Sequence, residues 1–253
     1  MEIKIEKTRF LMFLDSILAL APECRVWLNE DGIEVRTTDT GNIAMVNAKI
    51  PASAFYGYEK LSDPIGLDLK KLKTACAFMM NGELMFAWDK KGKGKIHITD
   101  GGRYDYEYLP LDPNTIRKDP NPPEMFLPSS IIIDGKEFQE SIAAMSKIGD
   151  KVKLCLDDKV FTMKTPGDTD SLTGEIPCEV VAPIKKRVSS IISLDYLQDV
   201  GKIIGKAEGV TVSFATDHPI KIVCTVDQIA LEYLIAPRIE DDEETEPEKT
   251  EST

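Results

Sequence analysis

Apolar residues recur at helical spacing in four stretches of the chain, which begin at nearly even intervals of roughly 60 residues. The stretches are Thr8–Ala21, Asp68–Met80, Gly135–Gly149 and Ser193–Ala207. In the first of them, Phe10, Leu14 and Ile17 fall on one face, as a helix packed on a core requires. The repetition predicts four equivalent helices that arose by duplication and share one surface.

Between these stretches, short segments of alternating apolar and polar residues predict strands joined by polar turns. In the first half they are Glu2–Glu6, Arg25–Leu28, Gly32–Thr37, Ala44–Ile50, Glu83–Trp88, Lys95–Thr99 and Tyr104–Leu109. In the second half they are Ser130–Asp134, Lys151–Leu156, Val160–Lys164, Gly174–Val181, Ser189–Ile192, Val210–Ala215, Ile220–Val226 and Ala230–Ile235. Each half therefore repeats one order: strand, helix, several strands, helix, several strands.

A proline-rich segment separates the two halves. Six of the chain's 15 prolines lie in Pro110–Pro128, and because proline fixes φ and lacks an N–H donor, this segment is expected to be an extended strap. We therefore expect an N-terminal domain at residues 1–109, the strap at 110–128, a C-terminal domain at 129–239 and a disordered acidic tail at 240–253.

Charge is distributed unevenly along the chain. The net charge is −12, and the tail after Ile239 contains eight acidic residues and one lysine. The four helical stretches together carry +2, because the three lysines of the second stretch outnumber its one acid and the other stretches are balanced. On composition alone, ordinary solvated helix faces explain this best. The alternative is a surface kept less acidic because an anionic partner passes near it.

The chain offers no recognisable catalytic or metal-binding constellation. Its two histidines, His97 and His218, lack partners at the spacing of a triad or a metal site. The five cysteines form no CxxC pair, which is typical of a reduced, intracellular protein. No apolar run is long enough to span a membrane. We therefore expect no enzyme activity, no cofactor, no metal and no membrane partner.

Several segments, taken in order, resemble the proliferating cell nuclear antigen (PCNA) family, the sliding clamps of archaea and eukaryotes. The most specific is Tyr233-Leu234-Ile235-Ala236-Pro237-Arg238-Ile239-Glu240 at the end of the chain. The others are Asp31–Val35 followed by Thr38-Asp39-Thr40, then Ser146–Asp150, then Leu194–Leu197. The resemblance covers residues 1–240, and a tail rich in acids with no fused domain best suits an archaeal clamp.

The resemblance implies an α+β clamp fold, in which two similar domains place helices on an inner face and antiparallel sheets outside. Three protomers would close head to tail into a homotrimeric ring. The contact between subunits would be an antiparallel strand pair, Arg103–Leu109 of one protomer against Gly174–Val180 of the next. The candidate interface residues are Arg103, Tyr104, Tyr106, Tyr108, Gly174, Ile176, Cys178 and Val180.

On the same resemblance, the ring would encircle double-stranded DNA and slide along it through weak, sequence-independent phosphate attraction. The candidate DNA-facing residues are Arg9, Lys70, Lys71, Lys73, Lys136, Lys147, Lys202 and Lys206. The chain departs from the family in its first helix, where only Arg9 is basic. Glu140 and Asp195 also stand where relatives often carry a basic residue.

The resemblance also implies a groove on the outer face, under the strap, that binds short peptides of replication and repair proteins. Its candidate residues are Thr38, Asn42, Ile43, Met45, Phe126, Pro219, Leu234, Ile235, Ala236 and Pro237, with Ile43, Met45 and Ile235 as the floor. Asn42 replaces a frequent family histidine. The expected partners are DNA polymerase, clamp loader, ligase and flap nuclease, and the expected location is the cytoplasm, in association with the nucleoid.

Three other functions compete with a self-closing processivity clamp. The chain could be one subunit of a heterotrimeric clamp, whose edge strands fit different neighbours. It could be a peptide-binding adaptor that never encloses DNA. It could also be an intracellular enzyme on a duplicated α+β scaffold, although the missing catalytic constellation weighs against that reading.

Overall fold

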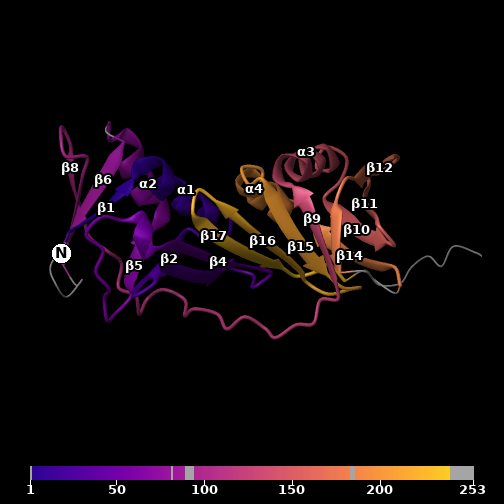
Figure 1. Cartoon of the computed structure of the whole chain (residues 1–253), viewed down its shortest axis with the longest axis horizontal. Helices are drawn as coiled ribbons and strands as arrows, with labels where there is room; N and C mark the ends of the chain where they lie inside the picture. Colours follow the sequence, from indigo (N-terminus) through magenta and orange to yellow (C-terminus); the bar gives the residue numbers. More distant parts are fainter. Residues whose placement is uncertain (1, 81, 89–93, 183–185, 240–253) are drawn as a thin grey trace, which may run out of the picture.

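The computed structural model describes residues 2–80, 82–88, 94–182 and 186–239. Within these ranges the chain forms four α-helices and three antiparallel sheets. The helices are α1 (Lys7–Leu18), α2 (Leu69–Phe78), α3 (Gly135–Met145) and α4 (Leu194–Ile204), and a short 3₁₀ helix, η1, covers Ala52–Ala54. All four helices lie on one side of the molecule (Figure 1). The predicted disorder of the acidic tail concerns residues 240–253, which lie outside the described residues.

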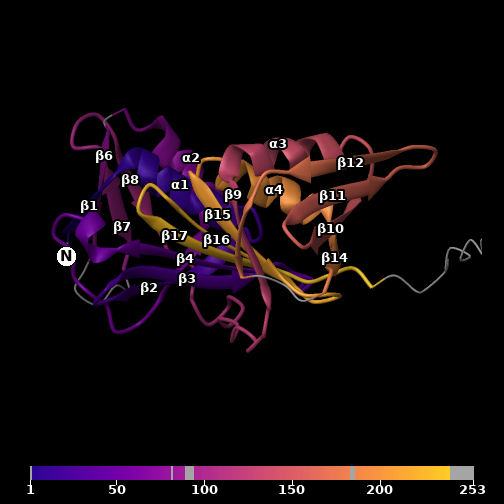
Figure 2. The same cartoon turned by 45° about the vertical axis from the view of Figure 1, so that its right-hand side comes forward.

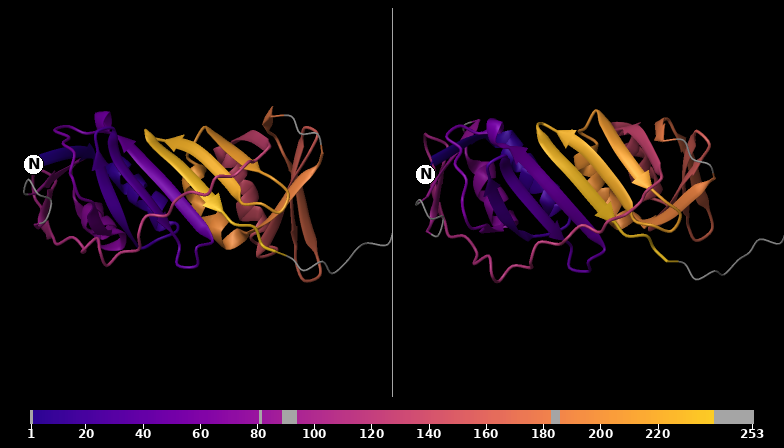
Figure 3. Two further views of the ribbon diagram at one scale, coloured as in Figure 1. Left: turned by 90° about the horizontal axis from the view of Figure 1, so that it is seen from below. Right: turned by 60° about the horizontal axis from the view of Figure 1, so that its bottom comes forward.

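The largest sheet has nine strands and takes them from both halves of the chain. Their order is β13 (Glu179–Ala182), β9 (Ser129–Asp134), β15 (Gly209–Phe214), β16 (Ile220–Val226), β17 (Ile229–Ile235), β4 (Ala44–Pro51), β3 (Gly32–Thr38), β2 (Glu23–Asn29) and β5 (Ile65–Asp68). Figure 3 shows this sheet from the side opposite the helices, with the strap running across it. The halves join where β17 pairs with β4, from Ala230↔Lys49 to Ile235↔Ala44. The boundaries of the two domains stay a prediction, because this sheet is continuous across them.

A four-stranded sheet lies toward each end of the molecule (Figure 2). The first has the order β1 (Glu2–Glu6), β6 (Glu83–Ala87), β7 (Ile96–Thr99) and β8 (Asp105–Tyr108). The second has the order β12 (Ser171–Ile176), β11 (Val160–Pro166), β10 (Lys151–Asp157) and β14 (Val188–Ser193). One edge strand of the first sheet, β8, and one of the second, β12, lie at opposite ends of the molecule (Figure 1).

Each helix begins at the residue directly after a strand, so the internal repeat is a strand–helix unit that occurs four times in the described chain. In two of these junctions an aspartate ends the strand and caps the helix. The Asp68 carboxylate accepts the Lys71 N–H at 2.9 Å, and the Asp134 carboxylate accepts the Glu137 N–H at 2.9 Å. Such a cap satisfies one of the N–H groups that a helix start leaves unpaired.

The prediction of one strand over Gly174–Val181 is wrong. The segment contains the end of β12 and most of β13, which belong to different sheets. Pro177 lies between the two strands and has no N–H to donate to a ladder, so the strand breaks there. Strand β5, with only four residues, was not predicted.

The core lies between the helices and the sheets, and it also connects the two halves. Phe13, Leu14 and Ile17 of α1 are at most 1% exposed. Tyr233 of β17 is fully buried beside them, and its hydroxyl donates to the Ser16 carbonyl at 2.9 Å. A strand of the second half is therefore fixed to a helix of the first.

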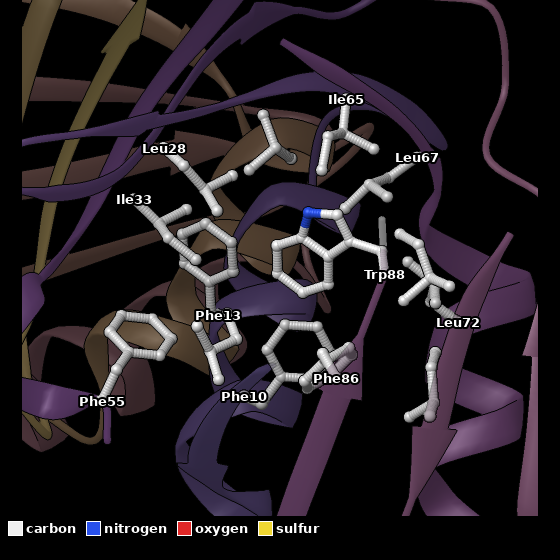
Figure 4. A pocket seen from close by; sticks show the side chains of 14 residues that line it. Phe10, Phe13, Leu28, Ile33, Phe55, Ile65, Leu67, Leu72, Phe86 and Trp88 are labelled. Atoms are coloured by element: carbon white, nitrogen blue, oxygen red, sulfur yellow. The ribbon is translucent and has the colours of Figure 1, made fainter. Parts of the chain in front are cut away.

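The first half contains a small apolar cavity of about 50 Å³ in its core. Figure 4 shows aromatic rings around it, among them Phe10, Phe13, Phe86 and Trp88. A cavity lined by apolar side chains gives water few partners and tends to stay dry. We therefore interpret this cavity as a packing gap in the core and not as a binding site.

Candidate functional site

The helical face carries the cations that were predicted to meet DNA, and about half of them have no carboxylate partner among the described residues. Lys70 and Lys147 are exposed and make no ion pair with any residue that the structure describes. Lys71 is exposed and places its ammonium 5.8 Å from the centre of the Tyr108 ring. Lys206 is exposed, with its Nζ 3.6 Å from the Met12 sulfur.

The other four cations are already paired with carboxylates of the same chain. Lys73 lies 2.6 Å from Asp15, and Lys202 lies 2.7 Å from Asp199. A looser pair, at 3.8 Å, joins Lys136 and Glu140 on α3. The side chain of Arg9 is only 13% exposed, because its guanidinium binds the Asp227 carboxylate at 2.8 Å.

This arrangement can attract an anion without holding it tightly. Exposed ion pairs contribute little stability and can exchange, so a passing phosphate can compete for the paired lysines. Phosphate contacts of this kind carry no sequence information. The helical face is therefore suited to weak, sequence-independent contact with a polyanion.

The two outer strands predicted to join subunits each leave one edge open. In the described structure, β8 pairs only with β7 and β12 pairs only with β11. Arg103 and Tyr104 precede β8, where the Tyr104 ring packs against Phe78 at 5.6 Å between centroids. Gly174 and Ile176 lie on β12. An open strand edge is a template for pairing with another chain.

Three residues predicted for this contact do not present their side chains on the open edges of β8 and β12. Tyr108 is 1% exposed, and its hydroxyl accepts the Asp68 N–H at 2.8 Å, so its side chain belongs to the core. Val180 lies on β13, which pairs with β9 in the nine-stranded sheet. Cys178 lies between the two sheets, after the break at Pro177.

The outer face of the central sheet brings together part of the predicted peptide groove. Cross-strand pairing places Thr38 and Leu234 on either side of Met45, in one row over β3, β4 and β17. Just beyond, the Ala236 N–H donates to the Ile43 carbonyl at 2.8 Å. Ile43 is 42% exposed and Phe126 of the strap is 85% exposed. These residues offer apolar surface at one end of the sheet.

The prediction that Ile235 lies in the floor of the groove is wrong in this structure. Successive side chains of a strand point to opposite faces, so Ile235 faces the helices while Leu234 and Ala236 face outward. Accordingly Ile235 has no exposed surface. Met45 points outward but is only 5% exposed. The remaining groove residues Pro219, Ala236 and Pro237 are partly exposed.

A loop at the edge of this groove is held by a residue that the sequence did not single out. Arg117 of the strap donates to Thr38 Oγ1 at 3.1 Å, to Asn42 Oδ1 at 2.6 Å and to the Asp39 carbonyl at 2.9 Å. The strap is also fixed by Trp27, whose indole N–H donates to Asp119 at 2.7 Å. A lone arginine in a proline-rich segment carries no pattern that would have identified this role.

Helices on one side, sheets on the other and an open strand at each end allow head-to-tail closure of repeated subunits. These features together define the DNA-clamp class of fold. No helix among the described residues is long and apolar enough to cross a membrane.

Comparison with known proteins agrees with this class. A DNA polymerase sliding clamp of Methanocorpusculum labreanum is 38% identical over 94% of this chain and 98% of its own length. One from Methanoculleus marisnigri is 36% identical over the same shares. No protein-family model matches the chain. The chain belongs to the DNA polymerase sliding clamp family.

Solved structures support the same assignment. Archaeoglobus fulgidus PCNA, bound to the C-terminal region of FEN-1, superposes with a TM-score of 0.85 at 27% identity, over 95% of this chain and 99% of that one. PCNA of Thermococcus kodakaraensis, at 17% identity and a TM-score of 0.82, shares the fold over 94% of this chain and 99% of its own. The resemblance seen in the sequence and the α+β clamp fold are thus confirmed.

Proposed function

We propose that this protein is a DNA sliding clamp, a ring of three copies that encircles duplex DNA and keeps a polymerase on its template. The observation that carries the proposal is the placement of four helices on one face with open strand edges at opposite ends. Pairing of β8 with β12 of the next copy would turn the helices toward a central hole. It would also cover two exposed strand edges.

In this ring, retention on DNA comes from enclosure and not from affinity. The exposed cations Lys70, Lys71, Lys147 and Lys206 would provide most of the phosphate attraction. The paired cations Arg9, Lys73, Lys136 and Lys202 would contribute less, because their carboxylate partners must first be displaced. Light contact of this kind allows the ring to slide.

The outer groove would dock short peptide motifs of DNA polymerase, clamp loader, ligase and flap nuclease. A peptide can anchor apolar side chains in a small preformed groove and still exchange, since few contacts carry its binding energy. The similar A. fulgidus protein was solved with the C-terminal region of FEN-1 bound. The protein would itself be non-catalytic and would work where the cell keeps its DNA.

Solution mass and DNA topology test the ring. Light scattering on a sizing column should give three times the protomer mass of 28.2 kDa. Protein threaded onto linear duplex DNA should be retained when both ends are then blocked, and should be lost after a restriction cut. Equal loss from blocked and cut DNA would contradict enclosure. A monomeric mass would favour a subunit of a heteromeric clamp or a simple adaptor.

Ile43 tests the groove, because it is exposed and lies beside Ala236. Ile43→Ser should weaken binding of a peptide from the C-terminal region of A. fulgidus FEN-1 by at least about tenfold, because it removes an apolar anchor contact. Calorimetric titration measures the change. Val223→Ser is the matched control, since Val223 is a 37% exposed aliphatic residue on β16, the strand next to β17. Equal affinities of both variants would remove Ile43 from the groove.

A further inference from the structure

One hydrogen bond links the helical layer of the second half to the groove loop of the first. The Tyr196 hydroxyl, on the first turn of α4, donates to Asp39 Oδ2 at 2.9 Å. Asp39 follows β3 and begins the loop that leads to Ile43 and β4. Residues 157 positions apart in the sequence are thereby joined.

The Asp39 carboxylate determines the shape of this loop. It accepts the backbone N–H groups of Gly41 at 2.8 Å, Ile43 at 2.7 Å and Ala44 at 2.8 Å. The Asp39 N–H in turn donates to the Ala44 carbonyl at 3.0 Å, which closes the loop. Within it, Asn42 adopts a φ of 57°, a left-handed conformation that asparagine tolerates better than most residues. One side chain therefore satisfies three backbone donors of the groove edge.

The charge states of the pair keep Tyr196 as the donor. Burial opposes ionisation of Asp39, which is 6% exposed, but the three backbone donors and the Tyr196 hydroxyl together hold its pKa below the ordinary value. Burial and the bond to Asp39 raise the pKa of Tyr196. Near neutral pH the bond thus joins a neutral hydroxyl to a carboxylate, which is stronger than a bond between neutral groups.

The loop is held from two directions, and its position decides where the groove presents its apolar surface. On the outer side, the Arg117 guanidinium donates hydrogen bonds to Thr38, to Asn42 and to the Asp39 carbonyl. Tyr196 holds the carboxylate from the side of α4. Ile43 lies at the end of the loop. Its carbonyl accepts the Ala236 N–H, and its side chain is exposed.

We infer that Tyr196 is a positioning residue for the peptide groove: through Asp39 it fixes the loop that presents Ile43. The inference rests on the proposed role of the groove in peptide binding. It also makes the groove dependent on the placement of α4, one of the helices proposed to face DNA. A helix on one face of the clamp thereby influences the binding site on the other.

Tyr196→Phe tests the inference, because it removes only the hydroxyl. Affinity for the C-terminal FEN-1 peptide of A. fulgidus should fall roughly 3- to 10-fold, since three backbone donors still hold the carboxylate. Amide hydrogen exchange at Gly41, Ile43 and Ala44 should become faster in the free protein. The matched control is Tyr58→Phe, whose lost hydroxyl bonds the Asn29 carbonyl at 2.8 Å, at the other end of β3. It should lower thermal stability without changing either readout.

The outcomes separate this inference from the proposed function. If the unaltered protein binds the peptide and Tyr196→Phe binds it equally well with unchanged exchange, the positioning role is overturned while the groove stands. If the unaltered protein does not bind the peptide, the groove proposal fails and the inference fails with it. Weaker binding by Tyr58→Phe to the same extent as by Tyr196→Phe would assign the effect to general stability and overturn the inference.

Discussion

At the scale of single residues, two buried carboxylates shape the loops that lie next to the proposed binding surfaces. Asp39 does so beside the groove, and Asp100 does so before the open strand β8. Asp100 is 5% exposed and accepts the N–H groups of Met80 at 2.9 Å, Gly102 at 3.0 Å and Arg103 at 3.1 Å. It therefore ties the end of α2 to the segment that leads into the edge strand.

The stability that Asp100 provides should depend on pH. The bond from the Met80 N–H is the main cause that lowers the pKa of Asp100 to about 2, and burial opposes it. A carboxyl with a lowered folded pKa stabilises the protein above its unfolded pKa of about 4, and this contribution declines as the pH falls from about 4 to about 2. Asp100→Asn should therefore lower the urea midpoint at pH 7, and its difference from the unaltered protein should shrink below pH 4.

Urea unfolding at fixed protein concentration, at pH 7, 4 and 3, measures this effect, because an assembling protein's stability depends on concentration. Asp112→Asn is the control, since the Asp112 carboxylate accepts the N–H groups of Asn114 in an exposed turn. The urea midpoint of Asp100→Asn is compared with that of the unaltered protein at each pH. If the difference stayed constant with pH, the effect could not be assigned to ionisation of the Asp100 carboxyl.

For the residues of the predicted groove, the sequence could have been used better to predict which side chains face outward. Ile235 and Leu234 are neighbours in a strand, so only one of them can face the groove, and alternation alone would have chosen Leu234. Asp39 stood within the motif Thr38-Asp39-Thr40, but the four donors to its carboxylate come from the loop backbone and from a distant helix. Contacts of that kind are invisible until the chain is folded.

At the scale of elements, carboxylates on the helices pair with cations that are proposed to face DNA. Asp15 on α1 pairs with Lys73 on α2, and Asp199 pairs with Lys202 within α4. The double variant Asp15→Asn with Asp199→Asn should free both lysines in every protomer. Each additional phosphate contact steepens the dependence of log affinity on log salt by roughly 0.9. We expect severalfold tighter DNA binding at low salt and a steeper slope.

Fluorescence titration of duplex DNA at several salt concentrations provides both quantities. The control is Asp158→Asn with Asp217→Asn, which makes the same change of charge in two strand-to-strand turns. Asparagine fits there, because both residues have positive φ, 52° and 57°. If both double variants steepen the slope equally, general charge and not release of Lys73 and Lys202 is responsible.

Helices were more predictable than strands at this scale. All four helices lie within the predicted stretches, apart from the start of α1 at Lys7, because an amphipathic pattern over ten or more residues is a strong signal. Strand β5 was missed because four residues carry little pattern, and Gly66 interrupts even that. The division of β12 from β13 could have been predicted from Pro177, because a proline inside an alternating segment argues against one continuous strand.

At the scale of the whole molecule, the duplication and the layered arrangement followed from the sequence, but the continuity of the central sheet did not. Pairing of β17 with β4 joins segments that are almost 200 residues apart, and neither strand carries a local signal for its partner. The proline-rich strap predicts a domain boundary but gives no information on how the two halves contact each other. In the structure both halves share one sheet, and the bond from Tyr233 to Ser16 is one of several contacts between them.

That shared sheet has a mechanical consequence. Bending a protomer at its middle would require breaking the six residue pairs between β4 and β17 and separating the core behind them. The edge strand β8 offers only four residues for the proposed contact between copies. The proposed ring of three such protomers would consist of three stiff arcs joined by three short seams. We expect that the work of admitting a DNA strand falls on one seam, while every arc keeps its curvature.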